Sequence, residues 1–134
     1  MPVVLDGKLK TVSDVVKNEL WRAEGFCRTT VEVTASGDLA LVVGDLVTAA
    51  GQPANTNGLD VAGIFIEDAL GNPYANIADG ESAQIVVLNK GAAIVVEGGL
   101  TYAGVPLDFA TPAAGATAAA AALEAKFIKV SKDI

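Results

Sequence analysis

The chain has 134 residues, a length typical of one domain with its own hydrophobic core. Hydrophobic residues make up 51% of it and are mainly Ala and Val, while aromatic residues make up 5%, so we expect thin β layers rather than a bulky core. The sequence has no His and a single Cys, which excludes an internal disulfide and leaves too few ligands for structural zinc. The net charge is −7.

The charge is distributed unevenly along the chain. Residues 1–28 carry five basic and four acidic side chains, whereas residues 29–125 carry Lys90 and eleven acidic ones. An acidic body repels phosphate groups, so we expect neither nucleic acid nor a membrane surface as a partner. No apolar run approaches the ~20 residues that cross a bilayer, and the N-terminus lacks a signal peptide pattern. We therefore expect a protein made in the cytosol.

Residues 1–25 are expected to form an extended N-terminal arm that precedes a single β-rich domain over residues 26–134. Within the arm, Asp6-Gly7 suits a two-residue hairpin turn between residues 3–5 and 8–10. The pattern that follows is ambiguous. Ser13 and Asp14 either open a helical turn or belong to an extended segment, and the residues leave both alternatives open.

The first clear strand is predicted over residues 27–34, because apolar and polar side chains alternate there. Its inward face is expected to hold Cys27, Thr29, Val31 and Val33. Turn residues recurring about every 8–12 positions then predict further short strands. They cover residues 39–43, 46–49, 61–66, 84–88 and 92–96.

Asn89-Lys90-Gly91 joins the last two of these strands, so we predict that they pair as a central hairpin, with 61–66 as a neighbouring strand. The polar loop over residues 50–60 is expected to be exposed to solvent. Its role is not determined by the sequence.

The segment over residues 110–125 is rich in Ala, and Pro112 and Gly115 delay any helix until about residue 116. A short helix over residues 118–126 is predicted, packed through Leu123 and capped by Thr117. The alternative is a low-complexity linker; the i, i+4 spacing of Leu123 and Phe127 favours the helix. A closing strand from residue 127 to 130 is expected to follow.

Few residues in the sequence offer catalytic chemistry. Without His there is no Ser-His-Asp triad and no Cys-His pair. Neither the GxxxxGK(S/T) phosphate-binding loop nor the GxGxxG dinucleotide-binding motif occurs. Cys27 is either a nucleophile activated by Arg28 or a buried thiol, and its place on the inward face of a strand favours burial. A second group, Glu67, Asp68, Asp79 and Glu81, offers a glycosidase pair or a calcium site, but adjacent turn signals favour solvated loop charges. We expect no enzyme, no metal and no cofactor.

The aromatic residues are more informative. Trp21 and Phe26 lie close together in the sequence, whereas the other aromatic residues, among them Tyr102, are scattered. Large aromatic side chains are typical anchors of protein interfaces. The alternative is that Trp21 and Phe26 cap one end of the β core, and the two roles are compatible across a subunit boundary.

The order of the segments resembles the head decoration proteins of tailed bacteriophages, the group related to protein D of phage lambda. The resemblance runs from about Ser13 to Val130. It rests on the order and spacing of short elements rather than on any one of them. These are SDVVKNELWRAEGFCRTTVEV, LVVGDLVTAAG, VAGIFIEDA, AQIVVLNKGAAIVVEGGLTYAG and the closing FIKV. The additional start MPVVLDGKLK and the long 50–60 loop depart from the family pattern.

The resemblance implies a mainly β domain with one short C-terminal helix, barrel-like or sandwich-like and of the β-tulip type. It also implies a homotrimer that binds the major capsid protein on the outside of the virion and stabilises the shell. The arm residues assigned to capsid contact are Val15, Val16, Lys17, Leu20, Trp21 and Arg22, and Phe26 and Tyr102 are assigned to trimer or core packing. The alternative function is a cytosolic β-barrel binding module or a structural subunit of another assembly.

Overall fold

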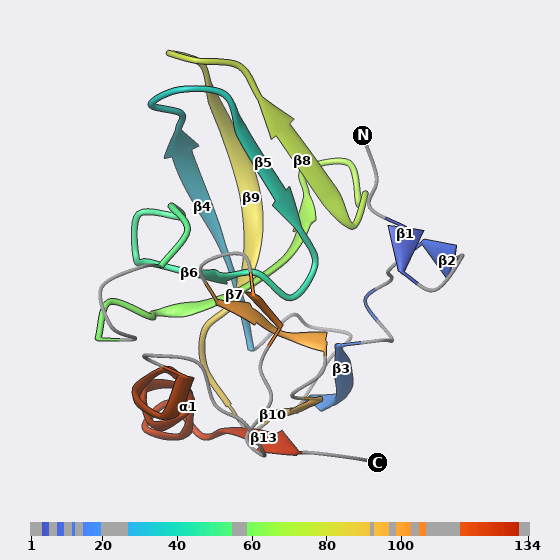
Figure 1. Ribbon diagram of the computed structural model, residues 1–134, viewed down its shortest axis with the longest axis vertical. Coiled ribbons are helices and arrows are strands. Elements are labelled where there is room, and N and C mark those ends of the chain that lie inside the picture. The colour runs from blue at the N-terminus through green and yellow to red at the C-terminus, as the bar shows by residue number, and fades with distance from the viewer. Residues whose placement is uncertain are drawn as a thin grey trace.

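A curled four-stranded antiparallel sheet forms the centre of the structure, a computed structural model (Figure 1). The structure describes residues 4–5, 8–9, 12, 15–19, 27–54, 59–91, 93–96, 99–102, 105–106 and 116–131. The sheet consists, in spatial order, of β4 (Arg28–Thr34), β9 (Ser82–Leu88), β7 (Gly63–Asp68) and β6 (Leu46–Val47). The predicted mainly β architecture with one short helix near the C-terminus is confirmed, and the sheet is a curled half-barrel.

Two further layers pack on this sheet. The upper one is the antiparallel ribbon of β5 (Leu39–Val42) and β8 (Tyr74–Ile77). The lower one is a three-stranded sheet of β13 (Ile128–Ser131), β10 (Ala93–Val96) and β3 (Val16–Glu19), together with helix α1 (Ala116–Glu124). Two small pairs complete the described elements: β1 (Val4–Leu5) with β2 (Lys8–Leu9), and β11 (Thr101–Tyr102) with β12 (Val105–Pro106).

Each layer closes its own hydrophobic core. The upper core lies between the ribbon and the central sheet, and the lower core lies between the central sheet, the three-stranded sheet and α1. The buried members of the upper core are Val33, Ala35, Leu41, Val47, Phe65, Ala75, Ile77, Ile85 and Val87. The lower core includes Val15, Cys27, Leu46, Ile64, Ile66, Leu88, Val95, Leu100, Tyr102, Leu123 and Ile128.

Most of the predicted elements are present. Leu5 pairs with Lys8 and Val4 with Leu9, which confirms the predicted pairing of the two short strands on either side of residues 6–7. The helix near the C-terminus is also confirmed, with Leu123 fully buried, but it begins at Ala116, so Thr117 lies within it and is not its cap. Along residues 27–34, the predicted inward face holds for Cys27, Val31 and Val33 but not for Thr29. That side chain is exposed, and its hydroxyl lies 3.0 Å from Asn89 Oδ1, to which it donates a hydrogen bond.

The predicted central hairpin is wrong, because β9 and β10 belong to different sheets. β9 pairs with β4 and β7, whereas β10 pairs with β3 and, in parallel, with β13. The physical reason lies in the connecting loop, where the Gly91 amide donates to the Lys126 carbonyl at 2.7 Å. This bond directs the chain away from β9 and toward the end of α1.

Two other expectations need correction. The 50–60 loop is not uniformly exposed, because Gly51 and Ala54 are buried, and the Ala54 amide bonds to the Leu46 carbonyl. Residues 55–58 lie outside the described residues. Phe127 does not pack beside Leu123, since its backbone adopts a φ of 63° and 78% of the residue is exposed.

The contact between Gly91 and Phe127 predicts a strong effect of a single added methyl group. A Cβ at Gly91 would overlap the backbone carbonyl of Phe127, which belongs to a fixed turn and cannot rotate away. We expect Gly91→Ala to lower the free energy of unfolding by about 3 kcal/mol, measured by chemical denaturation. Gly37→Ala is the matched control, because it adds the same methyl group at a position with no other atom within 4 Å, where φ is +84°. It should cost only about 1 kcal/mol, and equal losses for the two variants would contradict the close approach.

The turn between β7 and β8 is organised by one carboxylate. Asp68 Oδ1 accepts hydrogen bonds from the amides of Leu70 at 2.8 Å and Asn72 at 2.9 Å, and Oδ2 accepts one from Asn72 Nδ2 at 3.0 Å. Burial acts to raise the pKa of Asp68, but the bonds from Asn72, Leu70 and Gly71 outweigh it and hold this pKa below the ordinary value of 3.8. The charged form is therefore the one that the turn favours.

This lowered pKa predicts the sign of a pH dependence. Asp68 contributes stability at pH values above 3.8, and this contribution is lost as the pH falls through the lower pKa of the folded state. We expect Asp68→Asn to lower the melting temperature at pH 7 and to match the wild type more closely near pH 2. Thermal unfolding across this range tests it, with Glu32→Gln, an exposed carboxyl on β4, as control. A constant difference between Asp68→Asn and wild type at all pH values would contradict the assignment.

Candidate functional site

The candidate site is the N-terminal segment around β3, which the sequence assigned to a docking arm. Residues 16–19 are extended, whereas Ser13 and Asp14, for which two alternatives were left open, lie outside the described residues. β3 pairs antiparallel with β10, with Glu19 opposite Ala93 and Val16 opposite Val95, and the register shifts between Ile94 and Val95. The segment is thus part of the lower layer of the body (Figure 1).

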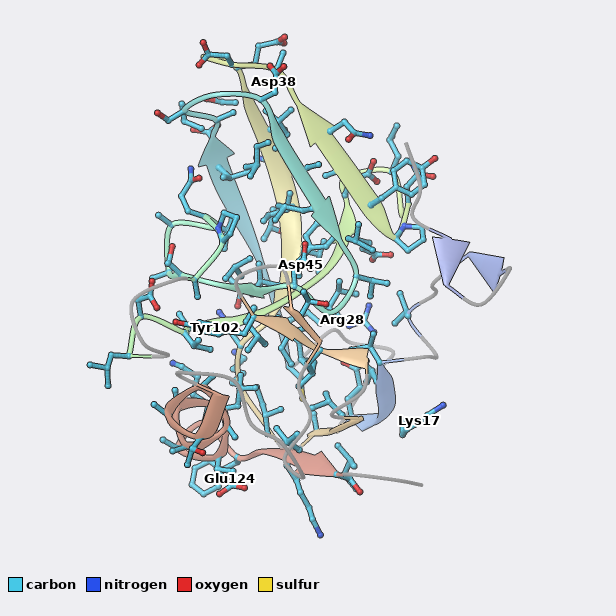
Figure 2. The ribbon with its side chains drawn as sticks, viewed as in Figure 1. Lys17, Arg28, Asp38, Asp45, Tyr102 and Glu124 are labelled. Carbon is cyan, nitrogen blue, oxygen red and sulfur yellow. The ribbon has the colours of Figure 1, made fainter. Side chains whose placement is uncertain are left out.

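The predicted contact residues fall into three groups. Val15 is fully buried in the lower core and Val16 is half-buried against it, so neither is presented to a partner in this fold. Lys17 is exposed and points away from the body (Figure 2). The third group, Leu20, Trp21 and Arg22, lies outside the described residues.

The two residues assigned to trimer or core packing also separate. Tyr102 is 5% exposed and belongs to the lower core of the single chain, which supports the core alternative. Phe26 lies outside the described residues. Residues 15–19 pack with the body, and the expected boundary at residues 25 and 26 lies outside the described residues.

An ion pair fixes β3 to the central sheet. Arg28 Nε donates to Glu19 Oε2 at 3.1 Å, and Nη2 donates to Glu19 Oε1 at 2.5 Å. The Glu19 side chain is completely buried and that of Arg28 is 16% exposed. Arg28 Nη1 also lies 3.8 Å from Glu67 Oε1, a more distant pairing that adds a second carboxylate on β7. The fork geometry of the guanidinium suits this two-point contact.

No pattern in the sequence indicated this pair. Glu19 and Arg28 are nine positions apart, and a Glu in a mixed-polarity segment is most often a surface residue. Only the pairing of β3 with β10, which turns Glu19 inward beside Ala93, places the carboxylate against Arg28 at the start of β4. A buried ion pair of this kind adds little net free energy of folding. Its main effect is to hold β3 in one position against the central sheet.

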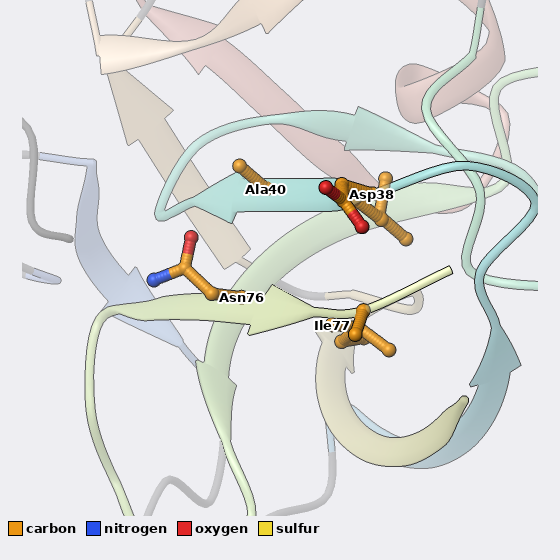
Figure 3. Close-up of a pocket in the computed structure, with 6 residues that line it drawn as sticks. Asp38, Ala40, Asn76 and Ile77 are labelled. Carbon is orange, nitrogen blue, oxygen red and sulfur yellow. The ribbon is translucent and has the colours of Figure 1, made fainter. Parts of the chain in front are cut away.

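A shallow pocket of about 370 Å³ lies on the ribbon of β5 and β8 (Figure 3). Its lining provides the Asp38 carboxylate and the Asn76 amide as side-chain polar groups; Leu39, Ala40, Ile77 and Ala78 complete it. Asp38 Oδ1 accepts a hydrogen bond from the Asp79 amide at 3.0 Å, and Asp79 Oδ1 accepts one from the Gly37 amide at 2.8 Å. These carboxylates therefore serve the two turns, as the turn signals indicated.

The other residues weighed for chemistry have structural positions. Cys27 is buried in the lower core, as predicted. Glu67 faces Arg28 and Asp68 organises its own turn. Among the residues that the structure describes, no three His, Cys, Asp or Glu side chains come together as metal ligands, and no helix has the length and apolar character to span a membrane.

Comparison with known proteins adds no relative. No protein-family model, no curated protein and no solved structure matches the chain.

The buried ion pair predicts an asymmetry between single and double substitutions. Arg28→Met or Glu19→Leu alone leaves one buried charge without its partner and should lower the free energy of unfolding by about 3 kcal/mol. The double variant should lose less than the sum of the two single variants, with a coupling of about 1–3 kcal/mol in a denaturation double-mutant cycle.

Glu67→Gln is the control for this cycle, because its carboxylate is 28% exposed and 3.8 Å from the guanidinium. We expect it to cost about 0.5 kcal/mol or less. Additive losses for Glu19 and Arg28 would show that the two side chains do not act together.

Proposed function

We propose that this protein is a capsid decoration protein that binds the outer surface of a phage head, as a trimer at local threefold positions, and stabilises the shell. The resemblance of the ordered segments from Ser13 to Val130 supports the class. The observation that carries the mechanism is the anchoring of β3 by Val15 in the core and by the Glu19 pair with Arg28. This supports a rigid body to which the chain is firmly attached at residues 15–19, which we call the root.

The structure changes which residues the proposal assigns to the capsid. The docking segment is residues 1–14, which precede the buried Val15, together with the exposed Lys17. Val15 and Val16 belong to the root, and Leu20, Trp21 and Arg22 stay assigned to capsid contact. The β1–β2 hairpin belongs to this segment and pairs with no described strand of the body. A backbone segment of this kind binds by adding a strand to an exposed sheet edge of the capsid protein, with side chains setting the register.

An anchored root matters because a decoration protein has to transmit force. A segment bound to the shell restrains the shell only if its other end is fixed in a body that does not yield. Val15 is fully buried and the Glu19 side chain has no exposed surface, so release of β3 would expose an apolar residue and separate a buried charge pair. Three such segments in a trimer act together through a high effective concentration.

The direct test uses undecorated heads assembled from the major capsid protein encoded in the same genome as this chain. We expect the full chain to cosediment with these heads, to saturate at three copies per local threefold position in an electron microscopy reconstruction, and to raise the temperature at which the heads rupture. Failure to bind would contradict the proposal and favour a structural subunit of another assembly.

The revised arm boundary makes a second expectation within the same experiment. Removal of residues 1–11 leaves Val12, Val15 and β3 in place, so the body should stay folded while head binding weakens at least about tenfold. Removal of residues 1–22 takes away Val15 and Glu19 and should unfold the lower layer, as seen by circular dichroism. Normal binding after removal of residues 1–11 would show that these residues are not the docking segment.

A further inference from the structure

Phe127 combines two unfavourable features at one position. It is the single described residue other than Gly with a positive φ, at 63°, a region that bulky side chains avoid because Cβ crowds the backbone. It is also 78% exposed, so its ring gains little from burial in its own chain. Strained residues of this kind concentrate at sites that contact a ligand or partner.

The fold accounts for the backbone of Phe127 but not for its side chain. The chain leaves α1 here by a turn in which the Phe127 amide bonds to the Glu124 carbonyl at 2.9 Å. The Lys126 carbonyl then accepts from Gly91 and the Phe127 carbonyl accepts from Ala93. A left-handed residue meets this need, and Gly or Asn is the usual choice at the end of a helix. An exposed Phe adds cost without improving the turn.

Four lysines belong to the three-stranded sheet or to the segments that join it. Lys126 adjoins it in the chain, and Lys90 belongs to the loop whose Gly91 touches the Phe127 backbone. Lys129 lies on β13 opposite Ile94, on the outer face of the three-stranded sheet, and the exposed Lys17 lies on β3 across β10. We call Phe127 with Lys17, Lys90, Lys126 and Lys129 the basic end. Among the described residues of this end, Glu124 is an exposed acid, whereas Glu19 is buried against Arg28.

The opposite end of the molecule is acidic. The two tip loops carry the exposed side chains of Asp38, Asp79 and Glu81, and Figure 2 shows Asp38 at the far end of the molecule from Lys17 and Glu124. The loops are joined by backbone bonds of Ala35 with Glu81 and Gly80. Four of the nine basic side chains of a protein of net charge −7 thus belong to the end that carries the exposed Phe127.

We propose that the basic end is a second docking face, on which Phe127 enters an apolar pocket of an acidic protein surface and the lysines contact acidic groups at the pocket rim. The inference rests on the proposed function, in which that surface is the outer face of the head shell. An aromatic anchor within a polar, charged rim is the usual anatomy of a protein interface. With the basic end on the shell, the acidic tip faces outward.

Charge favours this occupant over the others. Two copies of this chain meeting through their basic ends would bring like charges together, which is unfavourable. Nucleic acid or an anionic membrane would be repelled by the acidic remainder of the chain, and four lysines offer little to offset that. An acidic protein surface is attracted by the basic end alone and needs no contact with the rest.

The test is the substitution Phe127→Gly, for which a structural role and a docking role predict opposite results. Gly relieves the left-handed backbone, so we expect the melting temperature to rise by a few degrees. Removal of the anchor should weaken binding to undecorated heads roughly 30-fold, measured by cosedimentation. Leu70→Gly is the matched control, because Leu70 is 87% exposed in the turn between β7 and β8, away from the basic end, and should leave binding unchanged.

The rim is tested by charge reversal at Lys129. Lys129→Glu should slow association severalfold, and the difference from wild type should shrink as salt is raised. Glu81→Lys at the acidic tip is the control of opposite position and should not slow association.

Distinct outcomes overturn the inference. A lower melting temperature of Phe127→Gly would show that the ring stabilises its own chain. Full-strength head binding by this variant would refute the second docking face while leaving the proposed function in place, whereas absence of binding by the wild type would refute both. Loss of the trimer in Phe127→Gly would assign the ring to a second copy, and Phe127-dependent binding to anionic vesicles would assign it to a membrane.

Discussion

The structure depends on one strand that is buried on both faces. In β7, Ile64 and Ile66 point into the lower core while Phe65, between them, points into the upper core. All three are fully buried, which contributes roughly 2 kcal/mol for each side chain. A strand with two apolar faces has to be covered on each side. The ribbon of β5 and β8 therefore packs on one face of β7, and the lower layer packs on the other.

The same strand connects the two layers through its backbone. The turn at Gly44 and Asp45 follows the ribbon strand β5, and its groups bond to the amide and carbonyl of Phe65. The Gly44 carbonyl also accepts from Thr101, which leads into β11. The register shift between Phe65 and Glu67 bends β7 where it passes from one core to the other and leaves Glu67 facing Arg28. Fold and candidate site thus share one irregular strand.

The segment before β4 has two parts with different physical roles. Val15 and Glu19 hold β3 in the body through burial and through the pair with Arg28, so the chain is fixed at this point. Residues 1–14 precede this fixed point. The basic end adjoins β3, since Lys17 and Lys129 belong to the same three-stranded sheet. In the proposed function, the root of the docking segment and the basic end therefore share one sheet.

Local residue patterns determined most of the elements. Alternation predicted β4, the apolar runs predicted β7, β9 and β10, Asp6-Gly7 predicted the first hairpin, and the Ala-rich segment with Leu123 predicted α1. These features depend on side-chain periodicity and turn chemistry, which the sequence displays directly.

Only the tertiary structure decided which strands pair and which charges are buried. The sequence indicated a hairpin of β9 with β10, but the bond from Gly91 to Lys126 and the parallel pairing with β13 separate them. The burial of Glu19 follows from its place opposite Ala93, and the exposure of Phe127 follows from the left-handed turn that leaves α1. Each depends on contacts between residues far apart in the chain, and local periodicity carries no information about such contacts.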